Sequence, residues 1–126
     1  MDLYVNPGDE LPLYRQIVRQ ITDAIAGARL EPGERLPSHR DLATQLVIAP
    51  LTVKKAYDEL EQVGLIETQR GRGTFVRHRV QLPTSDERRE RLRDPAQRLL
   101  SQAALSDVPF ADVVKLLKEI RKGMES

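Results

Sequence analysis

Five cations in this sequence stand at expected helix starts or at the tip of an expected turn. Arg40 falls in the first turn of one predicted helix, and Lys54 and Lys55 fall early in another. A helix start normally favours acidic side chains, so these positions are unusual. Arg70 and Arg72 alternate with glycines, which allow a tight turn. Because guanidinium and ammonium groups bind phosphate, the pattern predicts a surface for a polyanion.

Residues suited to catalysis are scarce. His39 and His78 are the two histidines, and neither has a partner at the spacing of a metal site. A nucleophile would need a base and an orienting group, and no such set is present. The RGRG run at residues 70–73 lacks the GK[ST] ending of a phosphate-binding loop. We therefore expect no enzymatic activity, no metal and no cofactor.

Length and composition limit the class of protein further. The 126 residues suffice for one compact domain with an appendage, but not for a separate ligand-binding domain. Lysine and arginine number 20 against 19 acidic residues, a net charge of +1, so any nucleic-acid footprint must be local. Cysteine is absent, no apolar run approaches the ~20 residues of a membrane span, and the N-terminus lacks a signal-peptide pattern. These features predict a cytoplasmic protein with no membrane partner.

The cations lie within a predicted helix, turn, helix and hairpin. The second helix should run from Pro50 to Gly64, since proline suits a helix start and glycine the residue after its end. The first should open at Ser38, whose hydroxyl caps the helix, with Asp41 three residues on. The apolar stripe of the second helix consists of Val53, Ala56, Tyr57, Leu60 and Val63. The hairpin strands contain Leu65, Ile66, Phe75 and Val76 on either side of the Arg70–Gly73 tip.

The segments before this unit are simpler. Residues 12–28 show one amphipathic helix, and residues 31–34 carry the Pro-Gly pair of a type II turn. Tyr14, at the helix start, could touch a phosphate, although a packed aromatic is the commoner role. Residues 1–10 lack periodicity and are expected to form a poorly ordered arm.

This order of elements resembles the winged helix-turn-helix of the GntR family of bacterial transcription regulators. The resemblance covers roughly the first three-fifths of the chain, an ordinary size for a small domain. The short remainder resembles the YtrA subfamily, whose members have a reduced helical C-terminal part. The residues that carry the family resemblance are Leu11 to Ile17, Leu36-Pro37-Ser38, Arg40 to Ala43, Thr52-Val53, Ala56-Tyr57, Glu59 to Glu61, Gly64 to Ile66 and Arg70 to Val76.

The resemblance implies an α+β, mainly helical chain. A winged helix-turn-helix DNA-binding domain with a two-stranded wing would occupy residues 1–79, and a helical dimerisation region residues 80–126. It further implies a sequence-specific transcription regulator, a repressor that binds double-stranded DNA at an inverted-repeat operator as a homodimer. The residues expected at the DNA are Tyr14, Ser38, His39, Arg40, Leu51, Thr52, Lys54, Lys55, Arg70, Gly71, Arg72 and Gly73.

Three residues depart from the family pattern. Val47 stands where the family usually has glycine, and a β-branched residue tolerates positive φ badly, so we expect a different turn geometry. Ala49 and Leu51 replace commonly polar residues, which removes a helix cap worth about 1 kcal/mol and two possible base contacts. Leu51 could instead touch a thymine methyl group. The target sequence should therefore differ from that of polar-tipped relatives.

Two amphipathic helices are expected after the hairpin. Asp94-Pro95 marks a place where the first helix begins or bends, and the second should run from about Pro109 to Lys122. Helices this short cannot bury their stripes against each other alone, which predicts a homodimer; packing back on the same chain is the alternative. The predicted dimerisation residues are Leu99, Leu100, Ala103, Phe110, Val113, Val114, Leu117 and Ile120.

Two other functions stay open at this point. Ala49 and Leu51 make the helix start more apolar than a DNA reader usually needs, which suits a protein-interaction module whose C-terminal helices mediate assembly. A small-molecule effector between the C-terminal helices is a weaker possibility. The sequence leaves the operator, the effector and the sign of regulation open.

Overall fold

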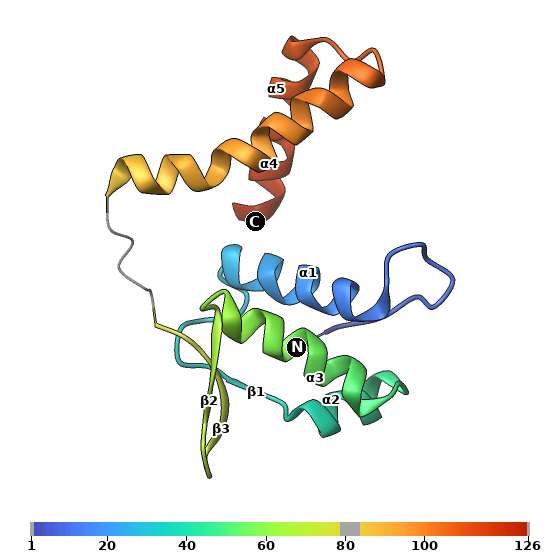
Figure 1. Cartoon of the computed structure of the whole chain (residues 1–126), viewed down its shortest axis with the longest axis vertical. Coiled ribbons are helices and arrows are strands. Elements are labelled where there is room, and N and C mark those ends of the chain that lie inside the picture. The colour runs from blue at the N-terminus through green and yellow to red at the C-terminus, as the bar shows by residue number, and fades with distance from the viewer. Residues whose placement is uncertain (1, 79–83, 126) are drawn as a thin grey trace. The chain divides into compact units, whose positions relative to one another are not determined.

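The computed structural model describes residues 2–78 and 84–125 and divides the chain into two compact units, Met1–Val80 and Gln81–Ser126 (Figure 1). The predicted boundary between residues 79 and 80 lies outside the described residues. The first unit contains the helices α1 (Leu13–Ala26), α2 (His39–Leu46) and α3 (Pro50–Gln62) and the strands β1 (Arg35–Leu36), β2 (Ile66–Gln69) and β3 (Gly73–Val76). The second contains α4 (Ser85–Leu105) and α5 (Phe110–Glu125). The prediction of a mainly helical α+β chain with an N-terminal winged helix-turn-helix is confirmed.

Helix α3 forms the centre of the first unit and packs against both α1 and α2. Val53, Ala56 and Leu60, which belong to its predicted stripe, are completely buried. The prediction that Val63 belongs to the same stripe is wrong, because Val63 is 64% exposed and follows the last helical residue. Gly64 then takes a φ of +84°, which turns the chain from the helix into β2. The apolar spacing therefore predicted the helix correctly up to its last turn.

The wing contains one strand more than predicted. Strands β2 and β3 pair antiparallel from Ile66 and Val76 to Gln69 and Gly73, as the hairpin prediction required. The two-residue strand β1 adds to the other side of β3, so the sheet order is β1-β3-β2. A strand of two residues shows no alternation in the sequence, which is why it was missed.

The turn before β1 and the N-terminal arm are both ordered. The predicted type II turn is confirmed, because Gly33 has a φ of +85° and the Glu34 N–H donates to the Glu31 carbonyl at 3.0 Å. The arm prediction was wrong. The Gln16 amide accepts from the Asn6 N–H at 2.8 Å and donates to the Asn6 carbonyl at 2.9 Å, and Gln20 holds Tyr4 in the same way. Each of these two glutamines thus bonds both the N–H and the carbonyl of one arm residue, as a neighbouring β-strand does.

The second unit is a pair of helices with little interior. Pro95 lies inside α4, so it does not start the helix, and the Thr84 hydroxyl caps α4 by accepting from the Glu87 N–H at 3.1 Å. Figure 1 shows that α4 bends along its length, as expected of a helix that loses a hydrogen bond at proline. Val113 is the one buried residue among the described residues of α4 and α5. None of the helices in the described residues could cross a membrane.

Candidate nucleic-acid interface

The start of α2 presents Arg40 to solvent. The Ser38 hydroxyl accepts a hydrogen bond from the Asp41 N–H at 3.1 Å, so the predicted helix cap is confirmed. The Ser38 hydroxyl is thus engaged in capping α2, and His39 is half-buried. Arg40 is exposed and forms no ion pair with any described residue. Its guanidinium group is therefore available to an anion.

The turn between α2 and α3 has the left-handed geometry that the β-branched side chain of Val47 was expected to prevent. Val47 adopts the left-handed conformation, with φ +57° and ψ +50°, although its side chain is β-branched. Two hydrogen bonds fix this conformation: Val47 N–H to the Thr44 carbonyl at 3.3 Å, and Ile48 N–H to the Ala43 carbonyl at 3.0 Å. These bonds complete the end of α2 and keep the chain in a turn that costs roughly 1–3 kcal/mol for such a residue. The expectation of a different turn geometry is therefore wrong.

The start of α3 lacks both a side-chain cap and an acidic residue. Ala49 offers no side-chain acceptor, and no carboxylate occurs in the first turn, so the predicted loss of a cap is confirmed. Pro50 occupies a position where its missing N–H is harmless. Leu51 is 77% exposed, whereas Thr52 is half-buried. This end of the helix is therefore open to a partner and apolar at Leu51.

The two lysines of α3 have different neighbours. The Lys54 ammonium lies 2.9 Å from an Asp58 carboxylate oxygen, and both side chains are at least half exposed. Such a pair contributes only about 0–1 kcal/mol, so it can be exchanged for another anion. The Lys55 ammonium lies 4.1 Å from the centre of the Tyr14 ring, a cation–π contact. Tyr14 therefore supports a cation of α3, a role that the sequence did not indicate.

A salt bridge between α1 and α3 lies next to this contact. The Arg15 guanidinium is 3.1 Å from a Glu59 carboxylate oxygen. Asp58 and Glu59, the acids that follow the lysines along α3, thus each neutralise a nearby cation. Lys55 pairs with no carboxylate among the described residues, so its positive charge stays available.

The wing tip is a tight turn that carries two exposed arginines. Gly71 and Gly73 have φ values of +79° and +126°, and the Arg72 N–H donates to the Gln69 carbonyl at 2.9 Å. Neither Arg70 nor Arg72 forms an ion pair with a described residue. Figure 1 shows the wing tip and α2 at the same end of the first unit. Two of the three predicted cationic segments, those on α2 and at the wing tip, thus lie at this end of the unit.

Arg35 is a third arginine of the wing, and no sequence pattern indicates its place there. A Cβ atom on Gly73 would lie 2.9 Å from Nε and 3.2 Å from Nη2 of Arg35, so the guanidinium lies directly over the Gly73 backbone. Only the pairing of β1 with β3 brings these residues together, and no local pattern indicates that pairing. Arg35 is exposed and therefore adds a cation beside the tip.

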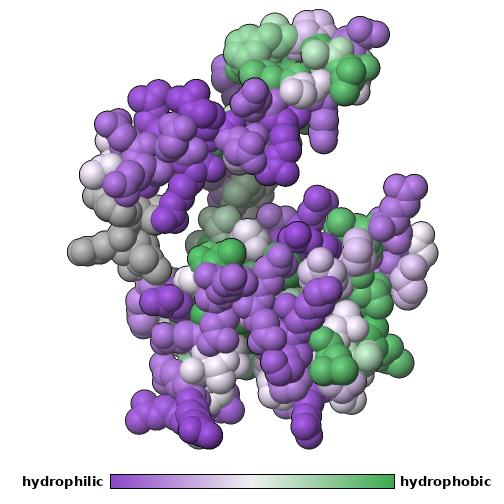
Figure 2. Space-filling model, in the orientation of Figure 1, coloured by the Kyte–Doolittle hydropathy of each residue, from purple (hydrophilic) through white to green (hydrophobic). Residues whose placement is uncertain are grey.

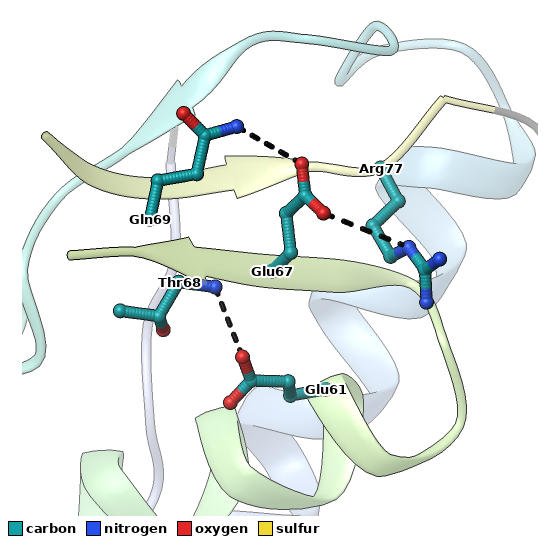
Figure 3. Close-up of polar contacts among 5 residues, drawn as sticks. All are labelled: Glu61, Glu67, Thr68, Gln69 and Arg77. Carbon is teal, nitrogen blue, oxygen red and sulfur yellow. Dashed lines mark hydrogen bonds and ion pairs between the residues drawn. The ribbon is translucent and has the colours of Figure 1, made fainter.

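Polar contacts fix the wing to α3 (Figure 3). A Glu61 carboxylate oxygen accepts from the Thr68 N–H at 2.9 Å, which ties β2 to the last turns of α3. The Glu67 carboxylate accepts from the Gln69 amide at 3.0 Å and lies 3.9 Å from the Arg77 guanidinium. Glu61 thus ties the wing to α3, whereas Glu67 makes contacts within the wing and engages Arg77.

Tyr57 fixes the entrance of α2 against α3. Its hydroxyl donates to the Pro37 carbonyl at 2.7 Å, directly before the Ser38 cap. Burial raises the pKa of the Tyr57 hydroxyl above its ordinary value, because the charged form would lose its hydration. The hydroxyl therefore stays protonated, and can keep donating this hydrogen bond, at an alkaline pH where an exposed tyrosine would ionise.

The described residues contain no cluster of side chains able to hold a metal ion. The arrangement consists of exposed cations around a helix start and a wing, with hydrogen bonds that position each element. Such an arrangement suits the binding of an extended anion.

Comparison with known proteins gives consistent results. The sequence profile described as "Bacterial regulatory proteins, gntR family" matches residues 13–76. The HTH-type transcriptional repressor YtrA of Bacillus subtilis (strain 168) is 33% identical over 118 residues, which cover 94% of this chain and 91% of that protein.

Two solved structures extend the likeness to the fold. A transcriptional antiterminator from Listeria monocytogenes EGD-e has a TM-score of 0.87 at 28% identity and covers 100% of this chain and 94% of that chain. The DNA-binding domain of AraR, solved in complex with operator ORX1, has a TM-score of 0.52 at 32% identity and covers 59% of this chain and 92% of that chain. The first likeness extends over both units, and the second covers a share of the chain close to the length of the first unit.

Proposed function

Because the chain belongs to the GntR family of bacterial regulatory proteins, we propose that it is a repressor that binds an inverted-repeat operator as a homodimer. Family membership makes it a DNA-binding transcription regulator with a winged helix-turn-helix. The repressor role is supported by its relative YtrA, which is a named repressor. The observation that carries the proposal is the set of exposed cations on α2, α3 and the wing.

Each cationic segment suits one part of the duplex. Thr52, Lys54 and Lys55 would face the major groove from the first turns of α3, as in other helix-turn-helix proteins. Arg40 would hold a phosphate from the start of α2. Lys54 would exchange Asp58 for a phosphate at little cost, because both partners are exposed.

The wing would bind the neighbouring backbone or minor groove. Arg70 and Arg72 extend from a turn that only glycines allow, and Arg35 adds a cation beside that turn. The hydrogen bond between Glu61 and Thr68 would keep the wing at a fixed distance from α3. A fixed spacing between helix and wing lets both contact one half-site.

The second unit supplies the apolar surface for a dimer. Phe110, Leu117 and Ile120 are between 47% and 68% exposed, although they lie on one predicted stripe. Leu100 is 45% exposed, and Leu99, Ala103 and Val114 are half-buried. Val113 is already buried in a single chain, so the other residues would form the interface. Two first units related by a two-fold axis would read two half-sites about 34 Å apart.

Fluorescence anisotropy with duplex DNA selected from a random pool tests the proposal. Wild-type protein should form a saturable complex, with nanomolar or tighter affinity for the selected sequence. Arg40→Ala and Lys55→Ala should each weaken binding, and each lost phosphate contact should flatten the salt dependence by about one unit. Arg98→Ala is the matched control, since Arg98 lies on α4 and pairs with Asp94 at 3.1 Å.

The outcome also distinguishes the alternative function. Unchanged binding of both test variants at raised salt would remove Arg40 and Lys55 from the DNA contacts. A protein that selects no DNA sequence but still dimerises would instead favour the protein-interaction module, which the exposed Leu51 suits.

A further inference from the structure

Val47 and Leu51 form an apolar tip on the helix-turn-helix. Their side chains are 88% and 77% exposed, among the highest values for large apolar residues in the described chain. Figure 2 shows hydrophobic groups gathered over the turn between α2 and α3, beside polar surface. Exposure of this extent gives the fold no packing energy, so the tip is available to a partner.

The backbone at Val47 supports a functional role for the tip. A β-branched residue in the left-handed conformation is strained, and here the strain is not offset by burial of the side chain. Strain of this kind concentrates at binding sites. Glycine would fit the turn better but would remove the apolar group.

The surroundings of the tip indicate which partner covers it. Leu51 lies in the first turn of α3, and the first turn contains no acidic residue. Lys54 and Lys55 follow directly, and Arg40 lies on the neighbouring helix without an ion pair to a described residue. An apolar group framed by cations is complementary to a polyanion that carries an apolar group of its own.

DNA has one such group in the major groove, the C5 methyl of thymine. We propose that the apolar tip reads thymine through this methyl group, with Leu51 as the main contact. The inference rests on the proposed function, because it needs α3 to enter the major groove. The proposal gives Leu51 a preference for thymine, at a position where a hydrogen-bonding side chain would read other bases.

Replacement of thymine by deoxyuridine tests the inference by removing only the methyl group. The selected duplex is synthesised with one deoxyuridine at a time, and its affinity is measured by anisotropy. Wild-type protein should lose about fourfold in affinity at one or two positions per half-site, the value expected for one buried methyl group. Leu51→Ala should abolish this penalty at its position without changing the salt slope, because no charge is lost.

Two further variants exclude a change of fold as the cause. Leu51→Met keeps an apolar side chain and should retain the deoxyuridine penalty. Val63→Ala removes an exposed apolar group, 64% accessible, that directly follows the C-terminal end of α3, and this variant should also retain the penalty. Equal affinity for thymine and deoxyuridine at every position would overturn the inference, as would Leu51→Ala keeping the penalty at every position where the wild-type protein shows one. Failure to select any DNA sequence would instead contradict the proposed function.

Discussion

The two units of the chain differ in how their apolar residues are used. In the first unit, Ile17, Ile21 and Leu60 are completely buried in a core to which all three helices and the sheet contribute. In the second unit, Val113 is the one buried residue among those described, and Phe110 and Leu117 remain exposed. A unit with a closed core can fold alone, whereas an open apolar face requires a partner. The difference supports the proposal that the first unit folds by itself and that the second mediates assembly.

Polar contacts show the same contrast. The first unit uses hydrogen bonds between residues distant in sequence, such as Tyr57 to Pro37 at 2.7 Å. The described ion pairs of the second unit join residues three or four apart on α4, namely Glu90 with Arg93 and Asp94 with Arg98. Local pairs of this kind support a helix but fix no tertiary arrangement. The first unit is therefore specified internally, and the second has few internal constraints beyond its helices.

The largest effect should follow a cavity in the first unit. Leu60→Ala removes a completely buried side chain from α3 and should lower the free energy of unfolding of that unit by about 2–5 kcal/mol. Urea denaturation at two protein concentrations measures it, and the loss should be the same at both. Leu105→Ala is the control, since Leu105 is 87% exposed and should cost little. A loss that depends on concentration would show that the first unit also needs the partner.

A charge in the apolar face of the second unit should break the proposed dimer. Leu117→Asp would bury a carboxylate against the partner chain, and we expect the dimer dissociation constant to rise at least about 100-fold, or roughly 3 kcal/mol. Analytical ultracentrifugation measures the change, and thermal unfolding of the first unit should be unaffected. Leu105→Asp places the same charge outside the predicted stripe and should leave the dimer intact. Unchanged association of Leu117→Asp would remove α5 from the interface.

Removal of one hydroxyl should have a smaller effect, confined to the first unit. Tyr57→Phe leaves the Pro37 carbonyl without its donor and should lower stability by about 1 kcal/mol at neutral pH. Burial raises the pKa of Tyr57, so the folded state resists ionisation more than the unfolded state does. Wild-type stability should therefore be constant with respect to this group below pH 10 and fall as the pH rises above it. The phenylalanine variant should lack this fall, and denaturation curves across that range would test the sign.

The sequence predicted those parts of the molecule that rest on local patterns. Periodicity and caps placed α2 and α3 and the hairpin, because helix starts, turns and stripes are written into neighbouring residues. Contacts between distant segments were beyond that reasoning. The pairing of β1 with β3 brings Arg35 over Gly73, and Gln16 and Gln20 hold the N-terminal arm, but neither contact has a local signal.

The candidate site shows the same division. Arg40, Lys55 and the two arginines of the wing tip lie exposed where the sequence predicted them, and their contacts with DNA remain a prediction. The support of Lys55 by Tyr14 emerged only from the packing of α1 on α3. At Val47 a local pattern gave the wrong prediction. The preference of a β-branched residue against positive φ was overridden by two hydrogen bonds at the end of α2.

Val47 also allows the smallest and most discriminating change. Val47→Gly relieves the strain of a β-branched residue at φ +57°, while the unfolded chain gains conformational freedom that opposes folding. The net result should be a stabilisation of the first unit by about 0.5–1 kcal/mol, measured by urea denaturation. A loss of stability would show that the exposed side chain makes contacts that offset the strain. If the variant is more stable yet discriminates thymine from deoxyuridine less well, then the strained residue serves DNA reading and not the fold.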